Sequence, residues 1–344
     1  MSTGRKSATT PLMSRRRLRL GAGSGSARPA VALFAAVTLL TLVIASASAA
    51  PASDAPSLPG MAIAGTDLSR GAISRQGYRR ETGFVLYYQR VFRRGAAYRR
   101  SRFLELEADV GLAGNARTAS TYVNGLESAF KSKRLRALLV RQILAGAPRG
   151  MKGLAKVTFG RVGKVGIGNQ AFIAPISISI GGLVRLQFAI AAVRVDRVDQ
   201  TLFLVGMPGA NLARADVAAL LRLAAGHMTT GLTPTVVTPP TITGTPQSGQ
   251  TLTATRGLWT NAPRSYGYQW LRCDGTGANC QPIADAVTST YLVTDTDIGS
   301  TLRVDVTATD AVATSVAAQS DATTIITGAP PAAPGAQTSS PARR

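Results

Sequence analysis

The sequence predicts two domains, an α+β domain with an antiparallel sheet followed by an all-β sandwich. Residues 61–228 alternate between runs of period two, which are typical of strands, and runs of helical period. Residues 239–327 contain short period-two runs at regular spacing, separated by turn residues. Net charge also changes along the chain, because residues 50–235 carry 26 Lys and Arg against 10 acids, whereas residues 236–344 carry 6 against 7. Two units with different surfaces are therefore expected.

Residues 1–49 have the organisation of a secretory signal peptide. The basic stretch Arg15–Arg19 precedes the apolar run Ala30–Ala45, and the small residues of Ala45–Ala49 offer cleavage sites. The apolar run is short for a membrane span, which needs about 20 residues. An uncleaved membrane anchor is the alternative, and both the general secretory and the twin-arginine export routes stay open. We expect the protein to be secreted or displayed at the cell surface.

Three segments have the composition of linkers or tails. Residues 50–60 are rich in Pro, Ala and Ser and are expected to be a linker. Residues 229–238 form a second linker that leads into Pro239 and Pro240, which favour an extended spacer. Residues 328–344 consist largely of Pro, Ala, Ser and Thr and are expected to be a disordered tail.

The domain at 61–228 is expected to contain strands, a long helix, three more strands and a final helix. In Phe103–Leu112 acidic and apolar residues alternate, as in a half-buried strand. A helix is expected from Ala116 to about Leu144 with Asn115 as its cap, and another over Leu212–His227 with Asn211 as a candidate cap. The strands expected between these helices are Ala171–Ile180, Val184–Val195 and Gln200–Val205. This layout resembles that of small α+β modules on actinobacterial cell surfaces.

The domain at 239–327 is expected to consist of short strands. In Thr301–Thr309 apolar residues alternate with polar ones, and Tyr268 and Trp270 share one strand face that would fill the core. The expected strands are Thr241–Gly244, Thr251–Ala254, Tyr266–Cys273, Thr290–Val293, Thr301–Thr309 and Thr323–Ile326.

The motifs of this segment are specific. They read G-x-T-L-T-A from Gly249, G-L-W from Gly257, Y-x-Y-Q-W-x-R-C-D-G-x-G-x-x-C from Tyr266, and T-Y-x-V-T-x-x-D-I-G-x-T-L-R-V-x-V-T-A from Thr290. They resemble the Ig-like module of secreted, multidomain actinobacterial proteins. The resemblance implies an Ig-like sandwich with a spacer, display or adhesion role. Such modules often occur in tandem, whereas this chain has one copy.

Cys273 and Cys280 are the two cysteines of the chain. Outside the cell they can form a disulfide, and the family resemblance places them at the ends of one hairpin loop. A zinc site is disfavoured because no histidine is near them in the sequence. We predict a disulfide, and neither a metal nor a cofactor.

The residue types needed for catalysis are sparse. The single histidine, His227, falls near the end of a helical pattern, where a cation favours the helix dipole. The glycine-rich stretch Gly160–Gly168 lacks the Lys-Ser/Thr pair of a phosphate-binding loop. Glu105, Glu107 and Asp109 form the one carboxylate cluster, which could serve a hydrolase or a calcium ion but is expected to be solvated or paired with arginine.

Arginine and aromatic residues alternate densely over residues 78–103. This composition is typical of polyanion-binding surfaces, although a strand pair with aromatic residues in the core and arginines outside would look the same. For an exported protein, anionic cell-wall polymers, glycans or lipid headgroups are more suitable partners than nucleic acid. The candidate binding residues are Arg79, Arg80, Arg90, Arg93, Arg94, Arg99, Arg100 and Arg102.

The sequence therefore predicts a non-enzymatic binding protein of the cell envelope or the surroundings of the cell. Its basic α+β domain would bind an anionic polymer or a small ligand, and its Ig-like module would act as a spacer. Contact with a membrane is expected only through an uncleaved N-terminal segment. The alternatives are a structural or adhesion protein without a ligand pocket, and a hydrolase of the envelope that uses the carboxylate cluster.

Overall fold

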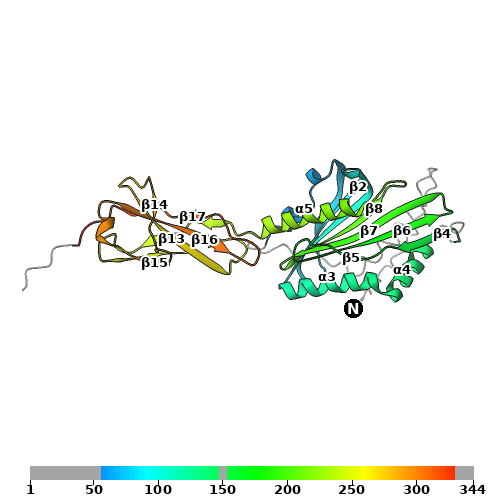
Figure 1. Ribbon diagram of the computed structural model, residues 1–344, viewed down its shortest axis with the longest axis horizontal. Coiled ribbons are helices and arrows are strands. Elements are labelled where there is room, and N and C mark those ends of the chain that lie inside the picture. The colour runs from blue at the N-terminus through cyan, green and yellow to red at the C-terminus, as the bar shows by residue number, and fades with distance from the viewer. Residues whose placement is uncertain (1–55, 147–152, 330–344) are drawn as a thin grey trace, which may run out of the picture.

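Antiparallel sheets dominate the computed structural model, which describes residues 56–146 and 153–329 (Figure 1). The larger sheet has eight strands in the order β1-β2-β3-β8-β7-β6-β4, with β5 paired to β6. The predicted signal peptide lies outside the described residues, as does nearly all of the predicted tail. The strands are β1 (Arg70–Arg79), β2 (Phe84–Tyr98), β3 (Ser101–Ala113), β4 (Ala155–Phe159), β5 (Gly163–Lys164), β6 (Gln170–Ile180), β7 (Val184–Val195) and β8 (Val198–Gly206).

Helices pack against both faces of this sheet. The helices α3 (Ala116–Lys131) and α4 (Lys133–Gly146) lie on one face, and the short α2 (Leu58–Met61) and the long α5 (Arg214–Leu232) lie on the other. Because β6, β7 and β8 are covered from both sides, they are apolar on both faces, as the runs of Ala, Ile, Leu and Val in the sequence require. The three predicted strands between the helices are confirmed.

The predicted helix from Ala116 to Leu144 is two helices. Ser132 interrupts it with an extended backbone (ψ 123°), and its hydroxyl accepts a hydrogen bond of 3.4 Å from the N–H of Leu135 at the start of α4. Serine is a favoured residue at helix N-termini because its hydroxyl replaces a missing backbone acceptor. Asn115 caps α3 as predicted, accepting a hydrogen bond of 2.9 Å from the N–H of Thr118.

Both predicted linkers contain structure. In the segment 50–60, Leu58 of α2 is fully buried in the core on the α5 face, as is Met61, so the domain begins before position 61. In the segment 229–238, α5 continues to Leu232 and β9 (Val236–Thr238) pairs with β12 (Leu258–Trp259). The composition of these segments suggested linkers, but their apolar residues are used for packing and strand pairing.

The closing helix runs over Arg214–Leu232 instead of Leu212–His227. The N-cap residue that precedes the helix is Ala213, which provides no side-chain cap, so Asn211 does not play the predicted capping role. The helix extends past His227 because Met228 and Leu232 continue its buried stripe. His227 is therefore an interior helical residue rather than one at the helix end.

The C-terminal part is a sandwich of small antiparallel sheets around one core. One sheet has the order β10-β11-β15 and another the order β14-β13-β16-β17. Trp270 is fully buried between them, and Tyr268 packs against the same core. The strands are β10 (Ile242–Thr243), β11 (Thr251–Ala254), β13 (Ser265–Cys273), β14 (Gln281–Pro282), β15 (Thr290–Leu292), β16 (Thr301–Thr309) and β17 (Ala318–Gln319).

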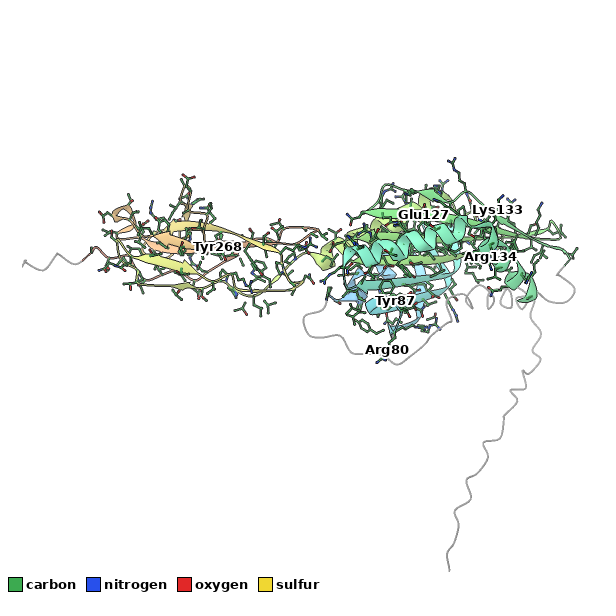
Figure 2. The ribbon with its side chains drawn as sticks, turned by 90° about the horizontal axis from the view of Figure 1, so that it is seen from below. Arg80, Tyr87, Glu127, Lys133, Arg134 and Tyr268 are labelled. Atoms are coloured by element: carbon green, nitrogen blue, oxygen red, sulfur yellow. A yellow bond between two sulfur atoms is a disulfide. The ribbon has the colours of Figure 1, made fainter. Side chains whose placement is uncertain are left out.

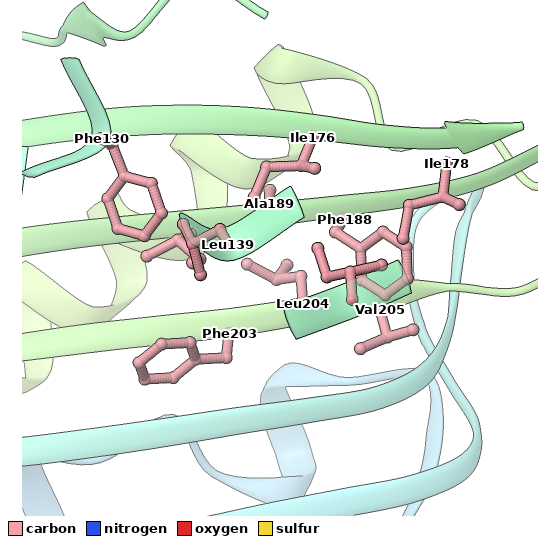
Figure 3. Close-up of a pocket in the computed structure, with 11 residues that line it drawn as sticks. Phe130, Leu139, Ile176, Ile178, Phe188, Ala189, Phe203, Leu204 and Val205 are labelled. Carbon is pink, nitrogen blue, oxygen red and sulfur yellow. The ribbon is translucent and has the colours of Figure 1, made fainter. Parts of the chain in front are cut away.

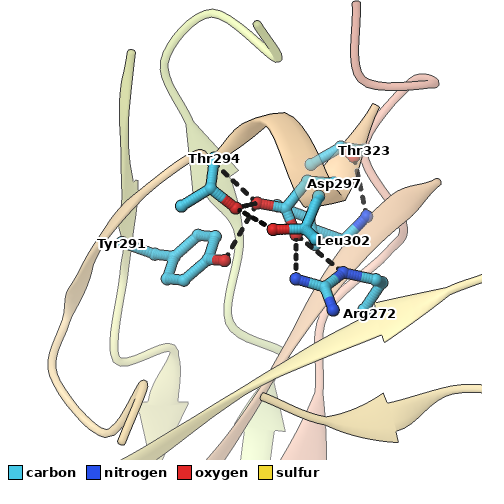
Figure 4. Close-up of polar contacts among 7 residues, drawn as sticks. Arg272, Tyr291, Thr294, Asp297, Leu302 and Thr323 are labelled. Carbon is cyan, nitrogen blue, oxygen red and sulfur yellow. Dashed lines mark hydrogen bonds and ion pairs between the residues drawn. The ribbon is translucent and has the colours of Figure 1, made fainter. Parts of the chain in front are cut away.

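The strand predicted at Thr323–Ile326 is not formed. The backbone there makes single hydrogen bonds instead, from the N–H of Thr323 to the carbonyl of Leu302 and from the N–H of Ile326 to the carbonyl of Ser300. The Thr323 hydroxyl accepts a further bond from the N–H of Leu302 (Figure 4). The Thr323 side chain thus takes the place of a backbone acceptor opposite Leu302 of β16. Continuous pairing with β16 is made instead by β17, opposite Asp305 and Val306.

A buried ion pair ties the sandwich together (Figure 4). The Asp297 carboxylate is fully buried and accepts bonds of 2.6 and 2.8 Å from the Arg272 guanidinium. It also accepts bonds from the Tyr291 hydroxyl (2.9 Å) and the N–H of Thr294 (2.8 Å). Burial raises the pKa of Asp297, but the bonds from Thr294 and Arg272 outweigh burial and lower it overall.

The predicted disulfide between Cys273 and Cys280 is present. Asp274 organises the loop that it closes, because its carboxylate accepts bonds from the N–H groups of Thr276 and Ala278 (2.9 and 3.0 Å) and from Asn279. These bonds lower the pKa of Asp274 below its usual value.

The two parts meet at the end of α5. The Asn261 amide donates to the carbonyls of Gly231 (2.9 Å) and Thr233 (3.2 Å), and Arg264 lies 3.7 Å from the Asp196 carboxylate. The helix α4, the strand β4 and the β6–β7 hairpin lie at the opposite end of the domain from the sandwich (Figure 1). Among the described residues, no helix combines the length and apolar character that a membrane span needs.

Candidate functional site

The eight candidate arginines do not form one surface. Their segment folds as β1, β2 and the start of β3, which is the strand pair foreseen as the alternative reading. Arg99 and Arg100 form the turn of the β2–β3 hairpin and are exposed, as are Arg80 and Arg102. Arg79 is half-buried on β1, and the side chain of Arg94 lies outside the described part of the structure.

Arg90 has a structural role. It is only 9% exposed, and its guanidinium donates to the carbonyls of Ile63 (3.0 Å) and Pro59 (3.2 Å) and to the Gln76 amide oxygen (3.1 Å). It thereby fastens the N-terminal segment to β2. A guanidinium whose donors are taken up inside the protein cannot also bind an external polyanion.

Arg93 faces the opposite side of β2 and forms an ion pair with Glu105 of β3. Glu105, Glu107 and Asp109 do share one face of β3, but they are 5%, 4% and 2% exposed and therefore interior residues. The Gln89 amide donates to Glu107, and the Tyr87 hydroxyl donates to Asp109 at 2.9 Å. Of this carboxylate row, only Glu105 has the expected arginine partner, and the expected solvation of the row is absent.

At its Asp109 end, this row lies near a further buried carboxylate, that of Asp199. Asp199 of β8 is 1% exposed, and neither of its oxygens has a hydrogen-bond partner among the described residues; the same holds for one oxygen of Asp109. Burial raises the pKa of both Asp109 and Asp199 well above the usual value; the Glu107 carboxylate adds to this effect for Asp109, and the Asp109 carboxylate adds to it for Asp199. Burial likewise raises the pKa of the adjacent Tyr122 hydroxyl.

Neither the histidine nor the glycine-rich stretch forms a reactive site. The Nδ1 atom of His227 lies 3.3 Å from the Ala62 carbonyl oxygen, and its Nε2 atom lies 3.6 Å from Asp67. In the glycine-rich stretch, Gly163 and Lys164 form β5 at the side of β6. The described residues contain no group of three or more His, Cys, Asp or Glu side chains placed to hold a metal ion.

The helices α3 and α4 enclose a small apolar cavity against the sheet (Figure 3). Its volume is about 40 Å³, and its walls include Phe130, Leu139 and Phe188. A second cavity, of about 180 Å³ and with a mixed polar and apolar lining, lies where the two parts of the chain meet and is lined by residues such as Asp196, Asn261 and Arg264. Both are smaller than the roughly 300 Å³ at which pockets for ordinary small ligands begin.

The largest unbalanced charge lies in residues 128–195. This stretch contains twelve Lys and Arg and no Asp or Glu. Lys131 pairs with Glu127 at 2.6 Å, and Arg136 is occupied by the Phe130 carbonyl and the Phe159 ring. Within this stretch, the exposed basic residues that take part in no ion pair between described residues are Lys133, Arg134, Arg141, Lys156, Arg161, Lys164 and Arg185.

Figure 2 shows Lys133 and Arg134 near the junction of α3 and α4, away from Arg80 and Tyr87 on the β1–β2 side of the sheet. The stretch without acidic residues can be found in the sequence alone, by counting Asp and Glu along the chain. The dense alternation of arginine and aromatic residues at 78–103 predicted a binding surface in that segment instead. That alternation instead reflects the two faces of long strands.

No family model and no curated protein matches the chain. Among solved structures it is similar to the crystal structure of a β-1,2-glucanase from Parabacteroides distasonis, at 11% identity and a TM-score of 0.17. The match covers 74% of this chain and 36% of the glucanase chain. A likeness at this TM-score carries no argument about fold or function.

Proposed function

We propose that this chain is an exported, non-enzymatic binding protein that holds an anionic polymer of the cell envelope through its basic α+β domain. The observation that carries the proposal is the set of exposed basic residues in 128–195, a stretch that itself contains no acidic residue. Such a surface attracts polyanions and concentrates them by long-range electrostatics. The signal-peptide pattern of residues 1–49 supports a location outside the cell.

The binding surface differs from the one suggested by the arginine-rich segment. Arg90 is consumed by structural hydrogen bonds, and Arg93 is neutralised by Glu105, which leaves the hairpin arginines as a minor contributor. In contrast, Lys133, Arg134 and Arg141 project from α4, a helix without any acidic residue. We assign the main part of polyanion binding to α4 and the neighbouring strands.

The C-terminal sandwich is proposed to be an Ig-like spacer. The motif string from Gly249 to Ala308, the buried Trp270 and the hairpin-loop disulfide support this assignment. Its near-neutral charge fits a unit that displays the basic domain without competing for the ligand.

The non-enzymatic part of the proposal rests on where the reactive groups lie. Glu105, Glu107 and Asp109 are interior residues of the sheet, and the single histidine contacts a backbone carbonyl inside the domain. A hydrolase would need a pair of carboxylates that substrate can reach.

The test is co-sedimentation of residues 50–344 with purified cell walls across a salt series. We expect binding that weakens as salt rises, because screening acts on exposed charges. The triple variant K133Q/R134Q/R141Q should bind at least tenfold more weakly, whereas the matched hairpin variant R99Q/R100Q should change binding by less than about threefold, since the rest of the basic surface is intact. Salt-insensitive binding, or a larger loss in the hairpin variant, would contradict the proposal.

A further inference from the structure

The end of the α+β domain farthest from the sandwich combines positive charge with protruding apolar side chains. We call it the distal surface and define it by α4, the β6–β7 hairpin tip and the start of β4. Leu183 is 94% exposed at the hairpin tip, and Leu154, which precedes β4, is 58% exposed. The two segments are adjacent, because the N–H of Gly181 donates to the Leu154 carbonyl at 3.0 Å.

A tight glycine turn leads into the exposed leucine. Gly181 and Gly182 both have left-handed backbones (φ 57° and 74°), which L side chains rarely adopt, and the N–H of Leu183 closes the turn onto the Ile180 carbonyl at 3.2 Å. Leu183 is the last residue of this turn and is almost fully exposed there. Arg185 follows two residues later, so the hairpin tip carries an exposed apolar side chain next to a positively charged one.

The outer face of α4 has the same mixed character. Its inner face packs through Leu139 and Ile143, while Leu135 and Leu138 are 41% and 45% exposed. Lys133, Arg134 and Arg141 are exposed on the same helix. Leucine set among basic residues on an outward helical face is the pattern of segments that lie in a membrane interface.

We infer that the distal surface docks onto an anionic phospholipid bilayer. Leu183 and Val184 enter the headgroup region, and the basic side chains of α4 bind the lipid phosphates. A hydrated polymer would satisfy the charges but would offer nothing to an almost fully exposed leucine, whereas a bilayer satisfies both. The inference rests on the proposed function in one respect, namely that the basic domain is exported.

The experiment uses residues 50–344, since every residue of the three described cores lies in this range. Its probe is vesicles of phosphatidylcholine with 30 mol% phosphatidylglycerol, compared with vesicles of phosphatidylcholine alone. We expect binding to the anionic vesicles at least tenfold stronger than to the neutral ones, because each basic residue near an anionic surface strengthens binding by about fivefold. The variant R134Q/R141Q should lose about 25-fold, and the matched variant R80Q on the β1–β2 side should lose little.

The apolar part is tested by L183S/V184T, with V316S in the sandwich as its control because Val316 is 89% exposed. The tip variant should weaken vesicle binding by about tenfold and leave cell-wall binding unchanged. In L183W, the added tryptophan emission should shift to shorter wavelength on anionic vesicles and be quenched by brominated acyl chains, whereas V316W should show neither change. Exposed positions contribute little to folding, so unfolding midpoints should match those of the unsubstituted chain.

Binding to cell walls but not to anionic vesicles would overturn the inference and leave the proposed function standing. Vesicle binding that is insensitive to the tip variant, with no shift in L183W, would also overturn it. Vesicle binding with tip insertion but no cell-wall binding would support the inference and contradict the polymer as ligand.

Discussion

The Tyr87 hydroxyl donates a hydrogen bond of 2.9 Å to the Asp109 carboxylate inside the sheet, while the other Asp109 oxygen and both oxygens of the nearby Asp199 have no partner among the described residues. Burial raises the pKa of both carboxyl groups. Because the pKa is raised in the folded state, these carboxyl groups lose their protons at lower pH in the unfolded chain than in the folded one. The free energy of unfolding of the domain that contains the eight-stranded sheet should therefore fall as pH rises from about 4, the unfolded-state pKa of aspartate, towards the folded-state pKa.

Asp199→Asn removes the group that resists ionisation while keeping its shape. We expect the variant to be more stable than the unsubstituted chain at pH 8 by about 1 kcal/mol and to show a flatter pH dependence. Urea unfolding followed by far-UV circular dichroism between pH 4 and pH 8 measures both effects. Asp321→Asn, at an exposed position in the sandwich, should change neither. A loss of stability at pH 8 in Asp199→Asn would contradict the account.

The ion pair between Arg272 and Asp297 predicts the opposite pH response for the sandwich. Because the pKa of Asp297 is lowered in the folded state, its contribution is present above about pH 4 and is lost as pH falls through the lowered value. Asp297→Asn should cost about 3 kcal/mol, since it leaves the Arg272 charge without its partner and Arg272 is only partly exposed.

This measurement can isolate one domain. The chain has two tryptophans, Trp259 and Trp270, and both lie in the core of the sandwich. Their fluorescence during urea unfolding therefore reports the sandwich alone. Asp305→Asn on the neighbouring strand β16 serves as the matched control, and a similar loss in both variants would rule out a special role for the buried pair.

The disulfide should contribute to the same transition. Cys273 and Cys280 are seven residues apart. The loop-closure entropy of so short a loop predicts that C273S/C280S lowers the free energy of unfolding by about 2.5 kcal/mol. A reducing agent should lower the free energy of unfolding of the unsubstituted chain, measured by tryptophan fluorescence, by a comparable amount. It should leave that of the variant unchanged. A variant that still responds to the reducing agent would show that another process is being measured.

A glycine in β3 is required by close packing. A Cβ atom at Gly111 would lie 2.4 Å from the Phe84 ring, which covers this part of the strand. Gly111→Ala should therefore destabilise the α+β domain by about 1–3 kcal/mol, because the ring must move. Gly114, three residues later, has open space around its Cβ position. Gly114→Ala is the matched control and should shift the thermal midpoint little; equal shifts in the two variants would contradict the steric explanation.

Much of the fold could be predicted because its signals are local. The Gly181-Gly182 turn, the period-two runs of β6 to β8 and the alternation in β16 each identify an element from a few neighbouring residues. The break at Ser132 and the extension of α5 past His227 could not be predicted, since both depend on what the helices pack against.

The candidate site was harder to predict for a physical reason. Period two placed Glu105, Glu107 and Asp109 on one strand face correctly, but it cannot tell whether a face meets water or other side chains. Likewise, the spacing of Arg90 and Arg93 gave no indication that one would bind backbone carbonyls and the other a carboxylate. Counting charges along the chain locates the basic stretch 128–195, although Lys131 within it pairs with Glu127, which lies just before it.

The contact of Asn261 with the last turn of α5 has a mechanical consequence. The carbonyls of Gly231 and Thr233 are held by this one amide, and the helix above them packs along the sheet through a buried apolar stripe. A pull on the sandwich is therefore transmitted along the axis of α5. The load reaches the eight-stranded sheet as shear distributed over several helical turns, so the sheet is not peeled open strand by strand.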